Sequence, residues 1–290
     1  MKKIFLLVLL LLAGCILQDP QDKVTNTGDE GISVHFVEEQ NDQVYDDSPL
    51  EIVSEFRNMG RYDQPFGKVV LYGYDSSILQ FDSQKQGYAE KQLPKLNAKT
   101  TYTPEGGYNT LAFKATEENL EVRDGDKYDT EIILATCYHY KTFLTQEVCV
   151  GNGGPCKSGP KTFGGQGAPV AITRIEQEMI SNKLNIIATI ENVGKGKVIA
   201  PEKSSYEACP FSLQEENTNR VKIKMSINGL TKESCSDSGL LTLTKGRGKV
   251  HCTFSKDSND EGGYTTQLQV EADYYYLNSD RRDITILSTP

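Results

Sequence analysis

The chain has 290 residues, a formal net charge of −9 and an apolar content of 37%. A nucleic-acid partner would require a basic surface, so the acidic balance argues against that class of function. The length favours two domains over one, and the 15 tyrosines favour strands.

The first fifteen residues predict export and lipid anchoring. A short basic start is followed by an apolar run over residues 4–13, which is too short to span a bilayer but is typical of the central region of a signal peptide. The run ends Leu-Ala-Gly-Cys15, which resembles the lipobox of bacterial and archaeal lipoproteins. The resemblance implies that residues 1–14 are removed and that Cys15 becomes the lipidated N-terminus. The alternative is an ordinary signal peptide with a coincidental cysteine.

Residues 15–30 are predicted to form the lipid anchor and a flexible tether. They are mostly polar, include Pro20 and Gly28, and show no apolar periodicity. Because the tether is short, we expect the first folded domain to lie close to the membrane.

An internal repeat predicts two copies of one β-rich unit. Residues 50–60 (LEIVSEFRNMG) align without gaps to residues 184–194 (LNIIATIENVG), and both alternate apolar or small residues with the period of a half-buried strand. Each ends in Asn-x-Gly, which we expect to form a tight turn through left-handed backbone angles. Residues 128–140 likewise align to 264–276. We expect each to be followed by a separate short strand, at 145–150 and 281–287.

The linker between the copies is predicted at residues 151–169, which hold seven glycines and three prolines. It separates a first domain at 31–150 from a second at 170–290. No segment after the signal peptide shows a helical apolar period, so the predicted fold class is all-β, with two tandem antiparallel sandwiches. The Asn-x-Gly strand and the Tyr-rich final segment look like the CARDB-type and related immunoglobulin-like modules of prokaryotic surface proteins. That resemblance implies immunoglobulin-like sandwiches.

Six cysteines remain once Cys15 is set aside, an even number that predicts three disulfides outside the cytoplasm. The order of the expected strands favours three pairs: Cys137 with Cys149, Cys235 with Cys252, and Cys156 with Cys209. The first would cross an expected hairpin, and the last would pin the linker to the second domain.

Metal binding is a weaker interpretation of two groups of residues. Cys137, His139, Cys149 and Cys156 could ligate zinc, but they lack the close C-x-x-C pairs of structural zinc sites. Two acidic turns are weak calcium candidates, Asp124-Gly-Asp126 and the turn holding Asp257, Asn259 and Glu261. The second places Leu268 where calcium loops require a bidentate Glu, so solvated turns are preferred and no cofactor is expected.

Catalytic and ligand-contacting residues are sparse. The histidines, His35, His139 and His251, fall in strand-like stretches, and no Gly-x-Ser-x-Gly turn is present. Basic turns at 194–197 and 245–249 could touch anionic groups, although lysines beside a glycine turn also guard strand edges. Residues 274–276 are three consecutive tyrosines. Strand alternation must put the outer two on one face and the middle one on the other.

The function predicted from these features is non-catalytic. We expect an exported, membrane-anchored protein at the cell surface or facing the periplasm, acting in adhesion or envelope assembly. Its expected partners are the membrane, through the lipid, and a surface protein or glycan. Alternatives are a lipoprotein that captures a solute or polysaccharide, and a metal-dependent hydrolase if His139, His251 and acidic loops converge.

Overall fold

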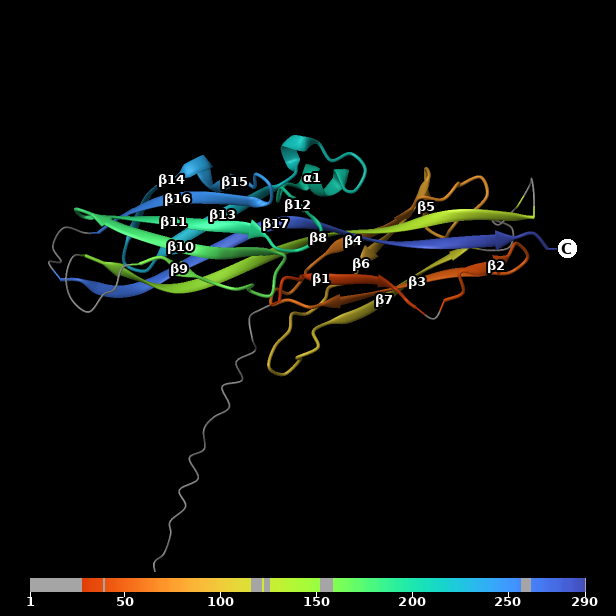
Figure 1. Cartoon of the computed structure of the whole chain (residues 1–290), viewed down its shortest axis with the longest axis horizontal. Coiled ribbons are helices and arrows are strands. Elements are labelled where there is room, and N and C mark those ends of the chain that lie inside the picture. The colour runs from red at the N-terminus through yellow and green to blue at the C-terminus, as the bar shows by residue number, and fades with distance from the viewer. Residues whose placement is uncertain are drawn as a thin grey trace, which may run out of the picture.

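The computed structural model describes residues 28–38, 40–115, 122, 126–151, 159–256 and 262–289. Strands dominate it, and they pair antiparallel except for β2 (Gln43–Tyr45) against β17 (Tyr264–Leu287). The helical elements described are α1 (Lys203–Ala208) and the 3-10 turns η2 (Glu215–Asn217) and η3 (Ser236–Gly239). The predicted all-β class is therefore confirmed. The molecule is elongated, with two halves end to end (Figure 1).

Two long strands run through both halves. β8 (Lys127–Val150) and β17 each have 24 residues, and they pair antiparallel over their whole length. The prediction that each would be two short strands separated by a turn is wrong. Residues 141–144 contain no Gly, Pro, Asn or Asp, and every step of each strand has a cross-strand partner, so nothing interrupts the hydrogen bonding.

β8 and β17 form the centre of a nine-stranded sheet, called here the long sheet. Its path runs β15-β13-β17-β8-β4-β6-β5, and β12 and β2 add to β17. The bounds of the remaining strands are β4 (Gly67–Tyr72), β5 (Gln84–Lys85), β6 (Tyr88–Leu93), β12 (Lys197–Ile199), β13 (Arg220–Ile227) and β15 (Leu240–Thr242).

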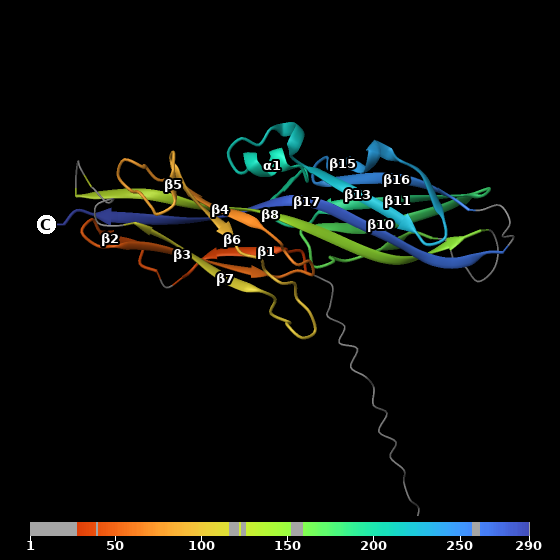
Figure 2. The same cartoon turned by 180° about the vertical axis from the view of Figure 1, so that it is seen from behind.

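A smaller sheet packs against each half of the long sheet (Figures 1 and 2). In the first half it has the order β1-β3-β7, with β1 (Ile32–Phe36), β3 (Leu50–Asn58) and β7 (Tyr108–Ala115). In the second half it has the order β14-β16-β11-β10-β9, with β14 (Thr231–Cys235), β16 (Arg247–Ser255), β11 (Lys183–Asn192), β10 (Val170–Ile180) and β9 (Lys161–Thr162). One apolar core fills the space between the layers and continues through both halves.

The two aligned Asn-x-Gly motifs play the same structural part in each copy. The Tyr140 hydroxyl donates to Asn58 Oδ1 at 3.2 Å, and the Tyr276 hydroxyl donates to Asn192 Oδ1 at 3.0 Å. The expected left-handed turn is wrong, because neither motif glycine has a positive φ. A Cβ on the glycine that ends each motif would instead collide with the tyrosine hydroxyl, so the glycine is needed for close approach.

The copies are related by an approximate two-fold axis across the long strands. His139 and Tyr275 occupy aligned repeat positions and are direct cross-strand partners at the middle of the β8–β17 ladder. Each copy therefore extends its last strand into the other half. The Thr142 hydroxyl of β8, for example, donates to the Val170 carbonyl of β10 at 2.6 Å. β8 and β17, which lie on either side of the expected boundary at residues 151–169, are thus shared by both halves.

An insertion at residues 200–219 breaks the symmetry. It lies between β12 and β13, carries α1, and packs on the long sheet of the first half (Figure 1). Cys209 of the insertion forms a disulfide with Cys137 of β8, and Phe211 packs edge-on against Tyr72 with ring centroids 5.0 Å apart. The insertion therefore covers the outer face of the long sheet, the one turned away from the smaller sheets, in the first half.

Candidate functional site

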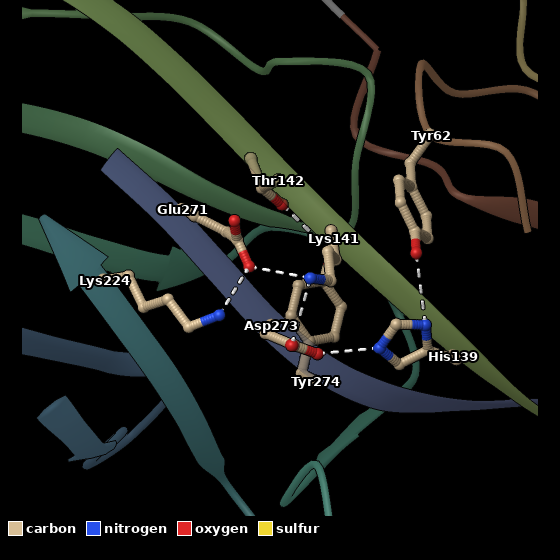
Figure 3. Close-up of polar contacts among 8 residues, drawn as sticks. All are labelled: Tyr62, His139, Lys141, Thr142, Lys224, Glu271, Asp273 and Tyr274. Carbon is tan, nitrogen blue, oxygen red and sulfur yellow. Dashed lines mark hydrogen bonds and ion pairs between the residues drawn. The ribbon is translucent and has the colours of Figure 1, made fainter. Parts of the chain in front are cut away.

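A cluster of polar side chains lies on the outer face of the long sheet, next to the two-fold axis (Figure 3). Strand alternation puts Tyr138 and Tyr140 into the core, so the intervening His139 and the following Lys141 face outward. Asp273, the cross-strand partner of Lys141, shares their face, and Glu271 lies two residues before it on β17.

Hydrogen bonds and ion pairs connect this cluster continuously. His139 Nε2 lies 2.7 Å from Asp273 Oδ1, and the Tyr62 hydroxyl lies 3.4 Å from His139 Nδ1. Lys141 bridges the two acids, at 3.3 Å from Asp273 and 2.7 Å from Glu271. The side chains of His139 and Asp273 are only 15% and 16% exposed, so this pair is shielded from water and interacts more strongly than a surface pair would.

Burial and neighbouring charges shift the pKa values of three side chains in the cluster. Burial disfavours the ionised carboxylate of Asp273, but hydrogen bonds and charge from His139 and Lys141 outweigh it and hold its pKa below the ordinary 3.8. Burial likewise disfavours the Lys141 ammonium, yet Glu271 and Asp273 raise the pKa of that amine above 10.5. Burial raises the pKa of the Tyr62 phenol, which stays neutral at physiological pH.

Aromatic rings extend the cluster on both sides. The His139 imidazole stacks on Phe66 at 5.6 Å with an interplanar angle of 3°, and Tyr62 contacts Phe143 at 6.1 Å. Phe66 and Phe143 are 41% and 52% exposed. Half-exposed rings beside compensated charges form a surface that can contact a ligand through both apolar and polar groups.

The cluster lacks the geometry of a nucleophilic or metal site. Both ring nitrogens of His139 have partners, Tyr62 and Asp273, and the nearest cysteine on the strand, Cys137, is oxidised in a disulfide. In the part of the chain that the structure describes, no group of three or more His, Cys, Asp or Glu side chains could hold a metal ion. The contacts hold the side chains of the cluster in fixed orientations and stabilise the register of β8 against β17.

The cysteines follow the predicted pairing in one case. Cys235 and Cys252 are bonded, as predicted. The pairing of Cys137 with Cys149 is wrong, because both lie on one continuous strand rather than on the two arms of a hairpin. The pairing of Cys156 with Cys209 is wrong as well, since Cys209 is bonded to Cys137. Cys15 and Cys156 lie outside the described residues.

The described residues of the zinc and hydrolase hypotheses do not come together in one site. Cys137, a proposed ligand beside His139, has no free thiolate because it is in a disulfide. His251 lies on β16 of the five-stranded sheet, whereas His139 lies on the long sheet. The calcium candidates Asp257, Asn259 and Glu261, and also Asp124, fall outside the described residues.

The expected alternation of the three tyrosines is confirmed. Tyr274 and Tyr276 are buried in the core at 0% and 1% exposure. Tyr275 points the other way and stacks on Tyr206 of α1 with ring centroids 5.1 Å apart.

Sequence reasoning missed the polar cluster. Lys141, Glu271 and Asp273 were not singled out, although each alternates with buried residues on its strand. That alternation was the available signal. What the sequence could not supply was the pairing of β8 with β17, which brings these residues together.

Comparisons with known proteins give little further guidance. Neither a family model nor a curated protein matches the chain. Among solved structures, Escherichia coli alpha-2-macroglobulin activated by porcine elastase is similar at 9% identity with a TM-score of 0.20. The similarity covers 89% of this chain and 22% of that one, and a score this low supports no conclusion about fold or function. No helix among the described residues is long and apolar enough to cross a membrane.

Proposed function

We propose that this protein is exported, is held at a membrane by a lipid on Cys15, and acts at the cell surface by binding or envelope assembly rather than by catalysis. The observation that carries the proposal is the pair of disulfides, Cys137–Cys209 and Cys235–Cys252. Structural disulfides persist in oxidising compartments outside the cytoplasm. They agree with the signal peptide and lipobox expected at residues 1–15, which lie outside the described residues.

The position of Gly28, where the described part of the chain begins, indicates where the membrane anchor would join the folded protein. The Gly167 amide donates to the carbonyl of Gly28 at 3.1 Å, and β1 starts near the junction of the two halves (Figure 1). An anchor at Cys15 would therefore attach near the middle of the elongated molecule. Thirteen residue steps from Cys15 reach at most about 45 Å, so the junction of the two halves, rather than the first domain alone, would lie within that distance of the membrane.

We further propose that each half is an immunoglobulin-like sandwich similar to the CARDB-type modules of prokaryotic surface proteins. Two packed antiparallel layers and the repeated Tyr-to-Asn hydrogen bond support this. The continuous β8–β17 pair would make the two modules one stiff unit, which suits a protein that must hold a binding surface in a fixed position away from the membrane.

Mass spectrometry of protein purified from native membranes tests the proposal. We expect a mature chain that begins at Cys15 and carries a diacylglyceryl group. Non-reducing peptide maps should link Cys137 to Cys209 and Cys235 to Cys252, and Cys149 and Cys156 should be joined as the pair that remains. An unmodified Cys15 would contradict the lipid anchor. Free thiols at Cys137 and Cys209 would contradict export to an oxidising compartment.

A further inference from the structure

Among the residues that the structure describes, no insertion covers the outer face of the long sheet in the second half. A shallow trench of about 540 Å³ lies there, within the size range of small-molecule and oligosaccharide sites. Its lining residues on β8, β17 and β13 include six that alternate outward along their strands, namely Phe143, Thr145, Gln269, Glu271, Lys224 and Ser226.

Strand register arranges these six side chains in two rows on one face. Phe143, Glu271 and Lys224 are successive cross-strand partners and form the first row. The second row is formed in the same way by Thr145, Gln269 and Ser226. Neighbouring strands lie about 4.8 Å apart and alternate residues about 6.6 Å apart, so the rows make a flat platform.

The first-copy equivalents of the paired β13 and β17 positions are apolar. Where the second copy pairs Lys224 with Glu271, the first pairs Val70 with Ala135, and both of these are buried.

The next row shows the same contrast. Ser226 and Gln269 are exposed in the second copy, whereas the first copy has Tyr72 and Ile133 there, and Tyr72 lies against Phe211 of the insertion. The two faces have therefore diverged, one to be packed over and the other to meet solvent or a ligand.

Contact with solvent does not explain why an apolar side chain, that of Phe143, is exposed on this face. On this otherwise polar face, the Phe143 ring is 52% exposed at the end of the first row. The ring is not isolated, because it tilts at 46° against Tyr62, which is itself fixed through His139. A held, half-exposed ring beside hydroxyl and amide groups is suited to contact the apolar face of a polar ligand.

The charges along the trench select against a strongly ionic ligand. Glu271 lies between Lys141 at 2.7 Å and Lys224 at 3.4 Å, and Lys141 also contacts Asp273. An ionic ligand would have to compete with these existing pairs, and Lys232 adds only one positive charge at the rim. Hydroxyl and amide groups on Thr145, Ser226 and Gln269 can both donate and accept hydrogen bonds, which matches a ligand rich in hydroxyl groups.

We propose that this trench binds a neutral saccharide chain, with Phe143 stacking on the apolar face of one sugar ring and Gln269, Thr145 and Ser226 bonding its hydroxyls. The inference deepens the proposed surface-binding function, since it names the class of partner and the residues that contact it.

Affinity electrophoresis of the full chain in a non-ionic detergent tests the inference. Native gels would contain hydroxyethylcellulose, yeast mannan or dextran as neutral probes, and polygalacturonate as the anionic probe. We expect retardation by at least one neutral polysaccharide and none by polygalacturonate. Phe143→Ala and Gln269→Ala should each weaken the apparent affinity about tenfold or more. Phe211→Ala, which removes a ring of similar exposure on the insertion, is the matched control and should bind as the unmodified chain does.

Three results would overturn the inference: no retardation by any of the three neutral polysaccharides, retardation by polygalacturonate alone, or undiminished retardation of a folded Phe143→Ala variant. Near-ultraviolet circular dichroism of the tyrosines checks that each variant is folded. The Cys15→Ser variant separates this inference from the anchor, because it should lose acylation and keep saccharide binding. If Cys15 is acylated but retardation does not depend on Phe143, the proposal for the trench fails and the proposal of a lipid anchor still holds.

Discussion

At the residue scale, three buried tyrosine hydroxyls connect the layers of the structure. Tyr140 and Tyr276 reach from the long sheet to the smaller sheets and bond Asn58 and Asn192 in the two copies. The Tyr138 hydroxyl makes a third such link by accepting a hydrogen bond from the Ile32 amide at 3.2 Å. These buried bonds tie the layers together at fixed points, because a buried hydroxyl without a partner is costly.

The glycine beside each Tyr–Asn bond should be intolerant of a side chain. We expect Gly60→Ala and Gly194→Ala each to lower the free energy of unfolding by about 1–3 kcal/mol, because the added methyl collides with the tyrosine hydroxyl. Urea denaturation followed by tyrosine fluorescence measures the effect. Gly164→Ala is the control, since a Cβ there meets no atom within 4 Å. Equal effects at all three glycines would contradict the close-approach explanation.

The ionised form of Asp273 should contribute stability that depends on pH. Its folded pKa is below the ordinary 3.8, so the contribution is present above that pH and is lost as the pH falls through the folded value. We expect Asp273→Asn to cost about 1–3 kcal/mol at pH 7, and the difference from the unmodified chain to shrink below pH 3.8.

Urea titrations between pH 7 and pH 2 measure that difference. Glu131→Gln is the matched control, because Glu131 pairs with Arg281 across the same two strands but both side chains are well exposed. It should cost less than about 1 kcal/mol. A cost for Asp273→Asn that stays constant down to pH 2 would mean that the charge does not supply the stability.

At the scale of elements, the insertion between β12 and β13 makes the outer face of the long sheet different in the two halves. It carries Tyr206 and Phe211 onto the first half and leaves the corresponding face of the second half open. The Cys137–Cys209 bond fastens it there. One inserted segment therefore accounts for the difference between a covered copy and an exposed one.

The two disulfides should contribute unequally. Cys137 and Cys209 are 72 residues apart and Cys235 and Cys252 are 17 apart, so the loop-entropy model gives about 4 kcal/mol for the first bond and about 3 kcal/mol for the second. Paired Cys→Ser substitutions at each bond, compared by non-reducing urea denaturation, test this order. A larger loss from removing the shorter loop would show that packing, not chain entropy, sets the contributions.

At the scale of the whole molecule, the shared strands should make the two halves fold as one. β8 and β17 contribute to the core of both halves, and the buried apolar cluster is continuous from one to the other. We expect scanning calorimetry of the full chain to give a single unfolding transition, with the calorimetric and van't Hoff enthalpies in agreement. Two resolved transitions would instead mean that each half unfolds independently despite the common strands.

Much of the local structure could be predicted from the sequence. The alternation in residues 50–58 and 184–192 identified β3 and β11, and the paired segments ending at Tyr140 and Tyr276 indicated a duplication. Cys235 and Cys252 were paired correctly, because they flank neighbouring strands, β14 and β16. The strand and disulfide predictions depend on residues that are close in the chain, and the duplication depends on comparing two segments of the sequence.

The remainder was decided only by tertiary structure. A period of two shows that a strand is half-buried but does not show where it ends or what it pairs with, so β8 and β17 were each divided by a turn that does not exist. The Cys137–Cys209 bond and the His139–Asp273 pair join residues 72 and 134 positions apart, and the trench brings Phe143 of β8 beside residues of β17 and β13. The alternation in the sequence indicates which residues of a strand face inward and which face outward. The packing of two copies around shared strands decided which outward-facing residues meet one another, because that depends on register and on where the insertion lies.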